Sequence, residues 1–171
     1  MTKIRGFEVA KGFEDEDIHL PTRQTAHAAG YDFEAADDII IPPLFAQYKE
    51  FVTPKLFGGE KPNISFKPTL VATGVKAYMP ADEYLEIANR SSNPLKRFLI
   101  LANGVGIVDA DYYNNPANDG HIMFQFLNFS PEPIHIHKGD RIGQGIFVEY
   151  ALADSDEATN TRDGGFGSTG H

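Results

Sequence analysis

The chain contains neither cysteine nor tryptophan among its 171 residues. The lack of cysteine excludes disulfide bonds and thiolate metal sites, and it suits the reducing cytoplasm. Long apolar runs are also missing, since residues 1–17 carry charges throughout and no later stretch is long enough to span a bilayer. We therefore expect a cytoplasmic protein with no membrane partner.

Positive charge is scarce as well. The 24 acidic residues outnumber the 15 basic ones and give a formal net charge of -9. A basic surface of the kind that binds nucleic acid is therefore not expected. A polyphosphate ligand would have to be attracted by local backbone N–H groups, a few arginines and a divalent cation.

Short apolar runs separated by turn-forming residues make up most of the chain. There are 11 prolines and 16 glycines, and no long helical period competes with the strand pattern. The pattern predicts one all-β domain over residues 1–171, a sandwich or barrel. The expected strands are residues 39–41, 69–75, 84–88, 99–102, 121–128, 134–137 and 145–150.

Residues 44–66 depart from the strand pattern. Phe45, Tyr48, Phe51 and Phe57 stand there among charges and loop formers. We expect an insertion that forms a packed surface flap with a short helix, and a separate functional module is the alternative.

The end of the chain, Arg162-Asp-Gly-Gly-Phe-Gly-Ser-Thr-Gly170, carries the clearest functional signal. Glycine has no side chain to pack, and its backbone entropy opposes regular structure. Successive N–H groups can surround an anion, while Ser168 and Thr169 add hydroxyl donors and Phe166 offers a face to a planar ring. The composition predicts a glycine-rich C-terminal arm over residues 152–171 that closes over a nucleotide, although a terminal tail without function fits it equally well.

A second informative stretch covers residues 102–115. Gly104 and Gly106 allow another group to approach the backbone closely, and a strand edge offers alternating N–H and C=O groups that match a pyrimidine. We expect this stretch to pair with the strand that begins at His121, as a β-hairpin with a broad tip. Asp109 and Asp111 end the apolar run; taken alone, they fit ordinary turn carboxylates better.

Two further clusters place polar side chains at turns. Arg90-Ser-Ser92 sets a guanidinium beside two hydroxyls, which suits phosphate oxygens. The same residues also occur in ordinary turns. Residues 138–144 form a tight turn that re-enters a strand. We expect Asp140 and Arg141 to pair within the fold, and Gln144 to point at a ligand.

Taken in order, these segments resemble the five motifs of the trimeric deoxyuridine triphosphate nucleotidohydrolases, the dUTPases. The motifs correspond to residues 29–33, 90–92, 103–112, 139–144 and 164–170. Each motif is weak by itself, but five in the family's order are specific. The resemblance implies a jelly-roll-like β-barrel assembled as a homotrimer with shared sites.

The resemblance also implies the reaction, which is hydrolysis of dUTP to dUMP and pyrophosphate, with dUMP serving dTTP synthesis. Asp109 matches the carboxylate that activates a water for in-line attack on the α-phosphorus. Gln144 matches a residue that holds this water or the substrate, and Asp32 matches one that reaches Mg²⁺ through water. Such chemistry needs positioning and charge neutralisation more than a covalent nucleophile.

The other motif residues are implied to bind dUTP. Tyr112 matches the ring that packs under the deoxyribose and excludes a 2′-hydroxyl. The implied contacts are Asn103, Gly106, Ile107 and Met123 for uracil, Arg90, Ser91 and Ser92 for phosphates, and Arg162, Phe166, Gly167, Ser168 and Thr169 for an arm that covers a neighbouring subunit's site.

Three positions depart from the usual family pattern. Glycine is common where Ser92 stands, and the arginine of the last motif usually lies one residue farther from the phenylalanine than Arg162 does. The turn of residues 114–119 is longer than usual, and the chemistry alone explains no role for it.

Two alternatives to the hydrolase remain. A dCTP deaminase shares the fold, but it needs a glutamate base where this chain has Gln125, and a neutral amide cannot take a proton from water. A protein that binds dUTP to respond to it, without hydrolysis, would use the same site.

Overall fold

The structure is a computed structural model that describes residues 3–57 and 67–159. The elements in chain order are β1 (Gly6–Val9), β2 (Tyr31–Glu34), β3 (Ile39–Ile41), α1 (Leu44–Phe57), β4 (Thr69–Ala72), β5 (Val75–Tyr78), β6 (Glu83–Asn89), η1 (Asn93–Arg97), β7 (Leu99–Leu101), β8 (Val105–Asp109), η2 (Ala110–Tyr112), β9 (Met123–Asn128), β10 (Ile134–Ile136) and β11 (Arg141–Glu149). In the part of the chain described, no helix is both long and apolar enough to cross a membrane.

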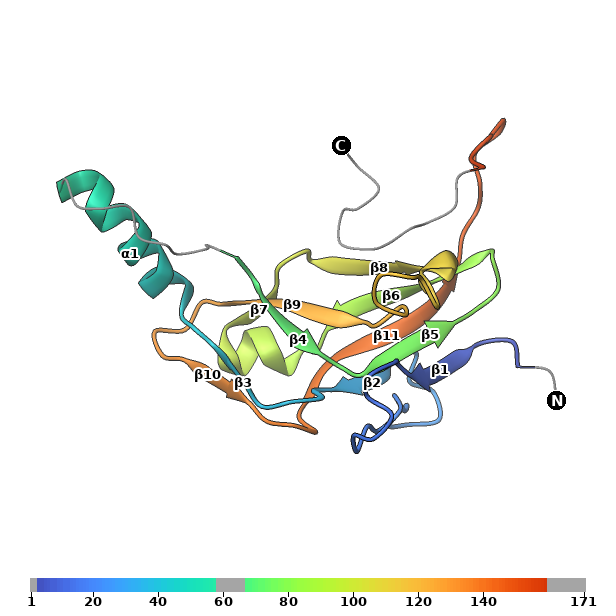
Figure 1. Cartoon of the computed structure of the whole chain (residues 1–171), viewed down its shortest axis with the longest axis horizontal. Helices are drawn as coiled ribbons and strands as arrows, with labels where there is room; N and C mark the ends of the chain where they lie inside the picture. Colours follow the sequence, from blue (N-terminus) through green and yellow to red (C-terminus); the bar gives the residue numbers. More distant parts are fainter. Residues whose placement is uncertain (1–2, 58–66, 160–171) are drawn as a thin grey trace.

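The strands form four antiparallel sheets. The two larger ones have the orders β2-β11-β6-β8 and β4-β9-β7, and the two-stranded ones pair β1 with β5 and β3 with β10 (Figure 1). Apolar side chains from both larger sheets enter one core, in which the rings of Phe33 on β2 and Phe124 on β9 lie 5.6 Å apart between centroids. The molecule is therefore a jelly-roll-like β-sandwich, as the sequence predicts.

Alternation of burial explains why these segments are strands. Along β9, residues are half-buried and buried in turn, so that Phe124 and Phe126 face the core while Met123 and Gln125 face the other side. β6 alternates in the same way, with Leu85 and Ile87 inside. The seven predicted strands all occur, but residues 69–75 divide into β4 and the start of β5 at a turn formed by Thr73 and Gly74.

The expected hairpin of residues 102–115 with the strand after His121 is wrong. β8 pairs with β6, with Tyr84 opposite Asp109 and Ala88 opposite Val105, whereas β9 lies between β4 and β7 in the other sheet. The chain thus changes sheets before and after β8. Because β8 and β9 do not share hydrogen bonds, space is left between them, and this space is the pocket described below.

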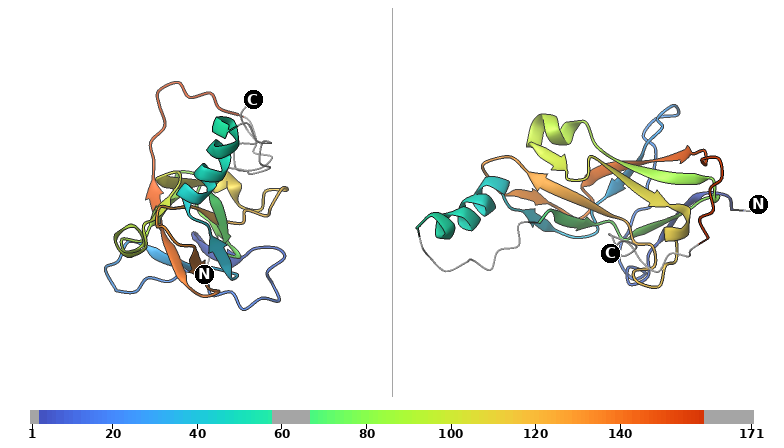
Figure 2. Two further views of the ribbon diagram at one scale, coloured as in Figure 1. Left: turned by 90° about the vertical axis from the view of Figure 1, so that its left-hand side faces the viewer. Right: turned by 90° about the horizontal axis from the view of Figure 1, so that it is seen from above.

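Helix α1 projects from one end of the sandwich in Figure 1 and in the right-hand view of Figure 2. Its first turn touches the body through the rings of Phe45 and Phe129, whose centroids are 6.2 Å apart. Phe45 and Tyr48 stay more than half exposed. The start of the 44–66 segment is therefore a helix of 14 residues, while residues 58–66 lie outside the described residues and the packed flap stays a prediction.

Candidate active site

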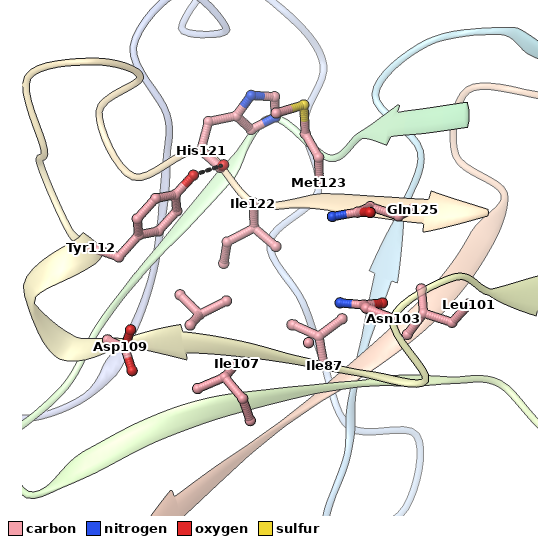
Figure 3. A pocket seen from close by; sticks show the side chains of 12 residues that line it. Ile87, Leu101, Asn103, Ile107, Asp109, Tyr112, His121, Ile122, Met123 and Gln125 are labelled. Atoms are coloured by element: carbon pink, nitrogen blue, oxygen red, sulfur yellow. Dashed lines mark hydrogen bonds between the residues drawn. The ribbon is translucent and has the colours of Figure 1, made fainter. Parts of the chain in front are cut away.

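A cavity of about 200 Å³ opens between β8 and β9 (Figure 3). Most of its lining residues are apolar, and polar side chains stand at its two ends. It is lined by Ile87, Leu101, Asn103, Gly106, Ile107, Val108, Asp109, Tyr112, His121, Ile122, Met123 and Gln125. An apolar cavity with a few fixed polar groups is the usual form of a small-molecule site.

The side-chain amides of Asn103 and Gln125 stand together at one end of the cavity (Figure 3). A tight turn holds Asn103 there, since the Val105 N–H donates to the Asn103 carbonyl at 2.8 Å and the Gly104 N–H donates to the Leu101 carbonyl at 3.0 Å. Each amide offers both a donor and an acceptor. This end of the cavity can therefore recognise a planar ring that carries N–H and C=O groups.

Asp109 and Tyr112 stand at the opposite end (Figure 3). Asp109 ends β8 and precedes the single turn of η2, which brings Tyr112 back over the cavity. Asp109 is half-buried, and Tyr112 is only 7% exposed. A carboxylate at the rim of a cavity can accept a proton from a water that attacks a ligand inside it.

The sequence analysis missed His121 and Ile122 as lining residues, and it considered Gln125 only as evidence against a deaminase. The two-residue period of β9 could have identified Gln125, because Met123 was already a candidate on the same face. His121 carries a pKa lowered by burial, so its imidazole is neutral.

A second cluster lies at the opposite end of the large sheet. Asp32 on β2 is 3.2 Å from Arg141 Nη1 and 3.8 Å from Arg90 Nε. Arg90 also donates to the Arg141 carbonyl at 3.0 Å, and Gln144 lies opposite Asp32 in the sheet. Arg141 thus pairs within the fold, as expected, while two guanidinium groups converge on one carboxylate.

A β-bulge in β11 puts these groups on one face. Arg141 pairs with Glu34 and Gly143 with Phe33, so that Ile142 and Gly143 together oppose Phe33. Both residues are buried on the core side. In a regular strand with the same residues, Arg141 and Gln144 would point to opposite faces, because they are three positions apart and strand side chains alternate.

Gly30 provides the space that Gln144 occupies. A Cβ atom at residue 30 would collide with Gln144 Oε1. The Gln144 amide lies against this backbone, and its Nε2 is 3.5 Å from the Asn89 carbonyl. Glycine at residue 30 therefore leaves room for this position of the Gln144 amide, and a larger residue would push the amide aside.

Ser91 and Ser92 follow Arg90 directly and lead into η1. Ser91 is exposed and Ser92 is half-buried, and the Ser92 side chain makes no capping hydrogen bond to η1. They lie beside the arginine cluster and outside the lining of the cavity.

The two clusters do not meet within one chain. Asp109 is opposite Tyr84, whereas Arg90 follows the far end of the same strand, β6. Arg90 lies six positions after Tyr84, which corresponds to about 20 Å at about 3.3 Å per position. The sequence predicts one site, and the structure divides its residues between two ends of a sheet.

No group of three histidine, aspartate or glutamate side chains that could hold a metal ion is found within residues 3–57 and 67–159. Asp32 is the one predicted metal contact, and its side chain is 15% exposed between two arginines. The predicted arm residues Arg162, Phe166, Gly167, Ser168 and Thr169 lie outside the described residues.

The family model for dUTPase matches residues 61–170. The chain belongs to the dUTPase family. It is 45% identical over 170 residues to the deoxyuridine 5'-triphosphate nucleotidohydrolase of Lactococcus lactis, covering 98% of this chain and 99% of that protein. It is 31% identical over 160 residues to the enzyme of the same name from Hydrogenobaculum, covering 91% and 92%.

Solved dUTPases share the fold. The crystal structure of dUTPase from Streptococcus mutans matches with a TM-score of 0.71 and 40% identity, covering 88% of this chain and 99% of that chain. A dUTPase from phage phi11 of Staphylococcus aureus matches with a TM-score of 0.65 at 14% identity, which shows the fold alone. The cavity and the arginine cluster are thus features of a dUTPase chain.

Proposed function

We propose that this dUTP nucleotidohydrolase forms dUMP and pyrophosphate by in-line attack of a water, activated by Asp109, on the α-phosphorus. The observation that carries the proposal is the cavity itself. It combines two amides suited to a pyrimidine with a carboxylate at the opposite rim. Membership of the dUTPase family supplies the substrate class.

Asp109 is the proposed general base. It takes one proton from the attacking water, the new P–O bond forms on the α-phosphorus, and the bond to the bridging oxygen breaks to release pyrophosphate. A positioned base of this kind contributes about 10²–10⁴ in rate. Gln144 is the proposed partner that holds the water or the substrate.

The cavity is proposed to hold uracil and the deoxyribose. Asn103 and the backbone of Gly106 and Ile107 would bond the polar edge of uracil, with Met123 as an apolar contact. Ile107 lies on β8, the edge strand of its sheet, so the backbone groups of β8 that point away from β6 are not used in that pairing. Tyr112 would exclude the 2′-hydroxyl of a ribonucleotide.

The arginine cluster is proposed to hold the phosphates, with Ser91 and Ser92 as hydroxyl donors beside Arg90. Mg²⁺ is usually held by one or two carboxylates together with substrate phosphates and waters. The single Asp32 carboxylate fits such a role, with contact through water. When bound, Mg²⁺ would neutralise phosphate charge, and the arginines would do the same by direct hydrogen bonds.

We further propose that the active site joins the cavity of one chain to the arginine cluster of another, in a homotrimer. The support is the separation of about 20 Å along the strands, which no single dUTP bound at Asp109 can close within one chain. The arm that includes Arg162, Phe166, Gly167, Ser168 and Thr169 would complete the site from a neighbouring copy.

A complementation experiment tests this arrangement. The Asp109→Asn chain and the Arg90→Ala/Gln144→Ala chain are each prepared alone and then co-expressed with different affinity tags. We expect mixed oligomers to release pyrophosphate from dUTP faster than either parent, because some sites then combine native residues from two chains. Mixed oligomers with no gain over the parents would contradict a shared site, and light scattering gives the number of chains.

The deaminase alternative loses support from the position of Gln125. This residue lines the cavity beside Asn103, where a glutamate would be well placed to deprotonate water, but an amide has no such capacity. A purely dUTP-responsive role stays a prediction, and tight dUTP binding without turnover would favour it. Supply of dUMP for dTTP synthesis, a cytoplasmic location and the absence of nucleic-acid partners also stay predictions.

A further inference from the structure

Two asparagines hold Tyr112, one at its backbone carbonyl and the other at its ring hydroxyl. The Asn115 Nδ2 group donates to the Tyr112 carbonyl at 2.9 Å, and the Asn118 Nδ2 group donates to the Tyr112 hydroxyl at 2.7 Å. The two asparagines also bond each other, from Asn115 Nδ2 to Asn118 Oδ1 at 2.7 Å. We call Asn115 and Asn118 the asparagine clamp.

Backbone donors fix the orientation of both amides in the clamp. The N–H groups of Ala117 and Asn118 point at Asn115 Oδ1, at 3.0 and 3.2 Å, and the Gly120 N–H points at Asn118 Oδ1 at 3.2 Å. A backbone N–H can only donate, so these atoms must be oxygens. The Asn118 amide nitrogen therefore faces Tyr112, and the tyrosine hydroxyl oxygen must accept a hydrogen bond from it.

The tyrosine hydroxyl then has its own proton to give, and it donates to the His121 carbonyl at 3.2 Å (Figure 3). The His121 side chain is itself anchored, because its ring Nε2 accepts the N–H of Gly74 at 3.0 Å and of Thr73 at 3.3 Å. The Tyr112 hydroxyl is thus tied to the turn between β4 and β5 as well as to its own loop.

Gly120 lets the loop close this tightly. It has φ +81°, and a Cβ atom there would lie 2.7 Å from the Tyr112 carbonyl oxygen and 3.0 Å from Tyr113 Cα. Only glycine combines this left-handed backbone with such a close approach. The turn of residues 114–119, longer than usual in the family and without a role in the chemistry, is the segment that carries the clamp.

We propose that Asn118, supported by Asn115, is a positioning residue that sets the preference of this enzyme for deoxyribose over ribose. The proposal rests on the role of Tyr112 proposed above. A ring excludes a 2′-hydroxyl only if it cannot turn aside, and an edge that is hydrogen-bonded on two sides cannot turn without breaking both bonds. The clamp makes Tyr112 a rigid wall of the cavity.

The experiment measures sugar preference, defined as kcat/KM for dUTP divided by kcat/KM for UTP. We expect Asn118→Ala to lower the sugar preference by about tenfold, mainly through faster turnover of UTP. Tyr112→Phe removes the same bond from Asn118 and also the bond from the Tyr112 hydroxyl to the His121 carbonyl, so it should lower the sugar preference at least as much. The double variant should be no worse than Tyr112→Phe alone, because the bond from Asn118 to the hydroxyl is already absent in that variant.

Lys76→Met is the matched control. Lys76 Nζ donates to Asn114 Oδ1 at 2.6 Å and to Asp119 Oδ2 at 2.7 Å, so it holds the tip of the same loop without touching Tyr112. We expect this variant to lower the melting temperature and to keep the sugar preference. An equal loss of preference in Lys76→Met would overturn the clamp in favour of general loop stability.

Tyr112→Ala tests the proposed role of Tyr112 separately from the role of the asparagine clamp. If it leaves the sugar preference intact, the proposed role of Tyr112 fails. If it abolishes the preference while Asn118→Ala leaves it unchanged, the role of Tyr112 holds and the clamp alone is overturned.

Discussion

The two ends of the large sheet recognise ligands by different physics. At the Asp109 end, a cavity of mostly apolar residues is closed by hydrogen bonds in which Tyr112 and its neighbours already satisfy one another. At the Arg90 end, two arginines converge on Asp32, and their side chains are 28% and 43% exposed. The first end is shaped before a ligand arrives, whereas the second holds ion pairs that a phosphate can replace. Under the roles proposed above, base and sugar selection would depend on rigidity, and phosphate binding would depend on exchangeable charge.

Removing the proposed base should have the largest effect. In Asp109→Asn we expect kcat for dUTP to fall by about 10²–10⁴ while dUTP still binds, because an amide fills the same space but cannot accept the proton. Pyrophosphate release gives kcat, and calorimetry with a non-hydrolysable dUTP analogue gives the affinity. Asp111→Asn, two residues away in η2, is the control and should stay close to native activity. Loss of binding together with kcat would assign Asp109 a structural role.

Removing an arginine at the Arg90 end should have a smaller effect, and this effect should depend on salt. In Arg90→Ala we expect kcat/KM for dUTP to fall by about 10–100-fold, because a hydrogen bond to a charged group contributes about 1.5–3 kcal/mol. The loss should shrink as salt is added, since screening weakens this contact in the native enzyme too.

Arg90→Lys refines this prediction. It keeps the charge without the planar fork of donors, so it should recover part of the activity. If Arg90→Ala instead lowered the sugar preference and left the salt dependence unchanged, it would be wrong to assign phosphate binding to the Arg90 end and sugar selection to the Asp109 end.

The smallest expected effect is on the pH dependence of the unfolding free energy, through His121 at the Asp109 end of the sheet. Burial lowers the pKa of His121, so the folded state binds a proton less readily than the unfolded chain. Between the ordinary histidine pKa and this lowered value, the unfolded state holds more protons, and stability must therefore fall as pH falls. We expect the unfolding free energy to be constant above about pH 7 and to drop below about pH 6.5, by at most about 1.4 kcal/mol per pH unit.

His121→Gln checks this prediction, because the glutamine oxygen can accept the Thr73 and Gly74 N–H groups without titrating. Urea unfolding at a series of pH values should show a flatter profile between about pH 7 and about pH 5. The Glu8 and Glu83 carboxyls titrate below this range, since hydrogen bonds from Tyr113 and Arg5 lower their pKa values. His135→Gln, at an exposed position, is the control and should keep the native slope. A native slope in His121→Gln would exclude His121 as its source.

Much of the fold could be predicted because alternation is local. The burial pattern of β9 and β6 follows from residues that are adjacent in sequence, and both strands were found. The partner of β8 could not be found in this way. Its apolar run suits a hairpin with β9 as well as a sheet with β6, and only the turn at Asn103 sends it to the other sheet.

The candidate site shows the same limit. Asn103, Asp109, Tyr112 and Met123 were assigned to one ligand, and the cavity brings them together. The distance between Asp109 and Arg90 follows from strand register, which no single motif encodes. The asparagine clamp could not be predicted from the sequence either. Asn115 and Asn118 bond Tyr112 through side-chain atoms whose direction depends on the folded turn.

The bulge in β11 shows a second way in which this chain accommodates extra residues. Between β3 and β4 the chain accommodates a helix of 14 residues that projects from the sandwich and leaves the pairing of the sheets intact. In β11 a single extra residue lies within a strand, and the pairing with β2 continues on both sides of it. Loss of Ile142 would restore a regular ladder and keep Arg141 and Gln144 on one face, but the core would lose a buried side chain. A strand of this sandwich can therefore change its length by one residue without exchanging its faces, at a cost in core packing.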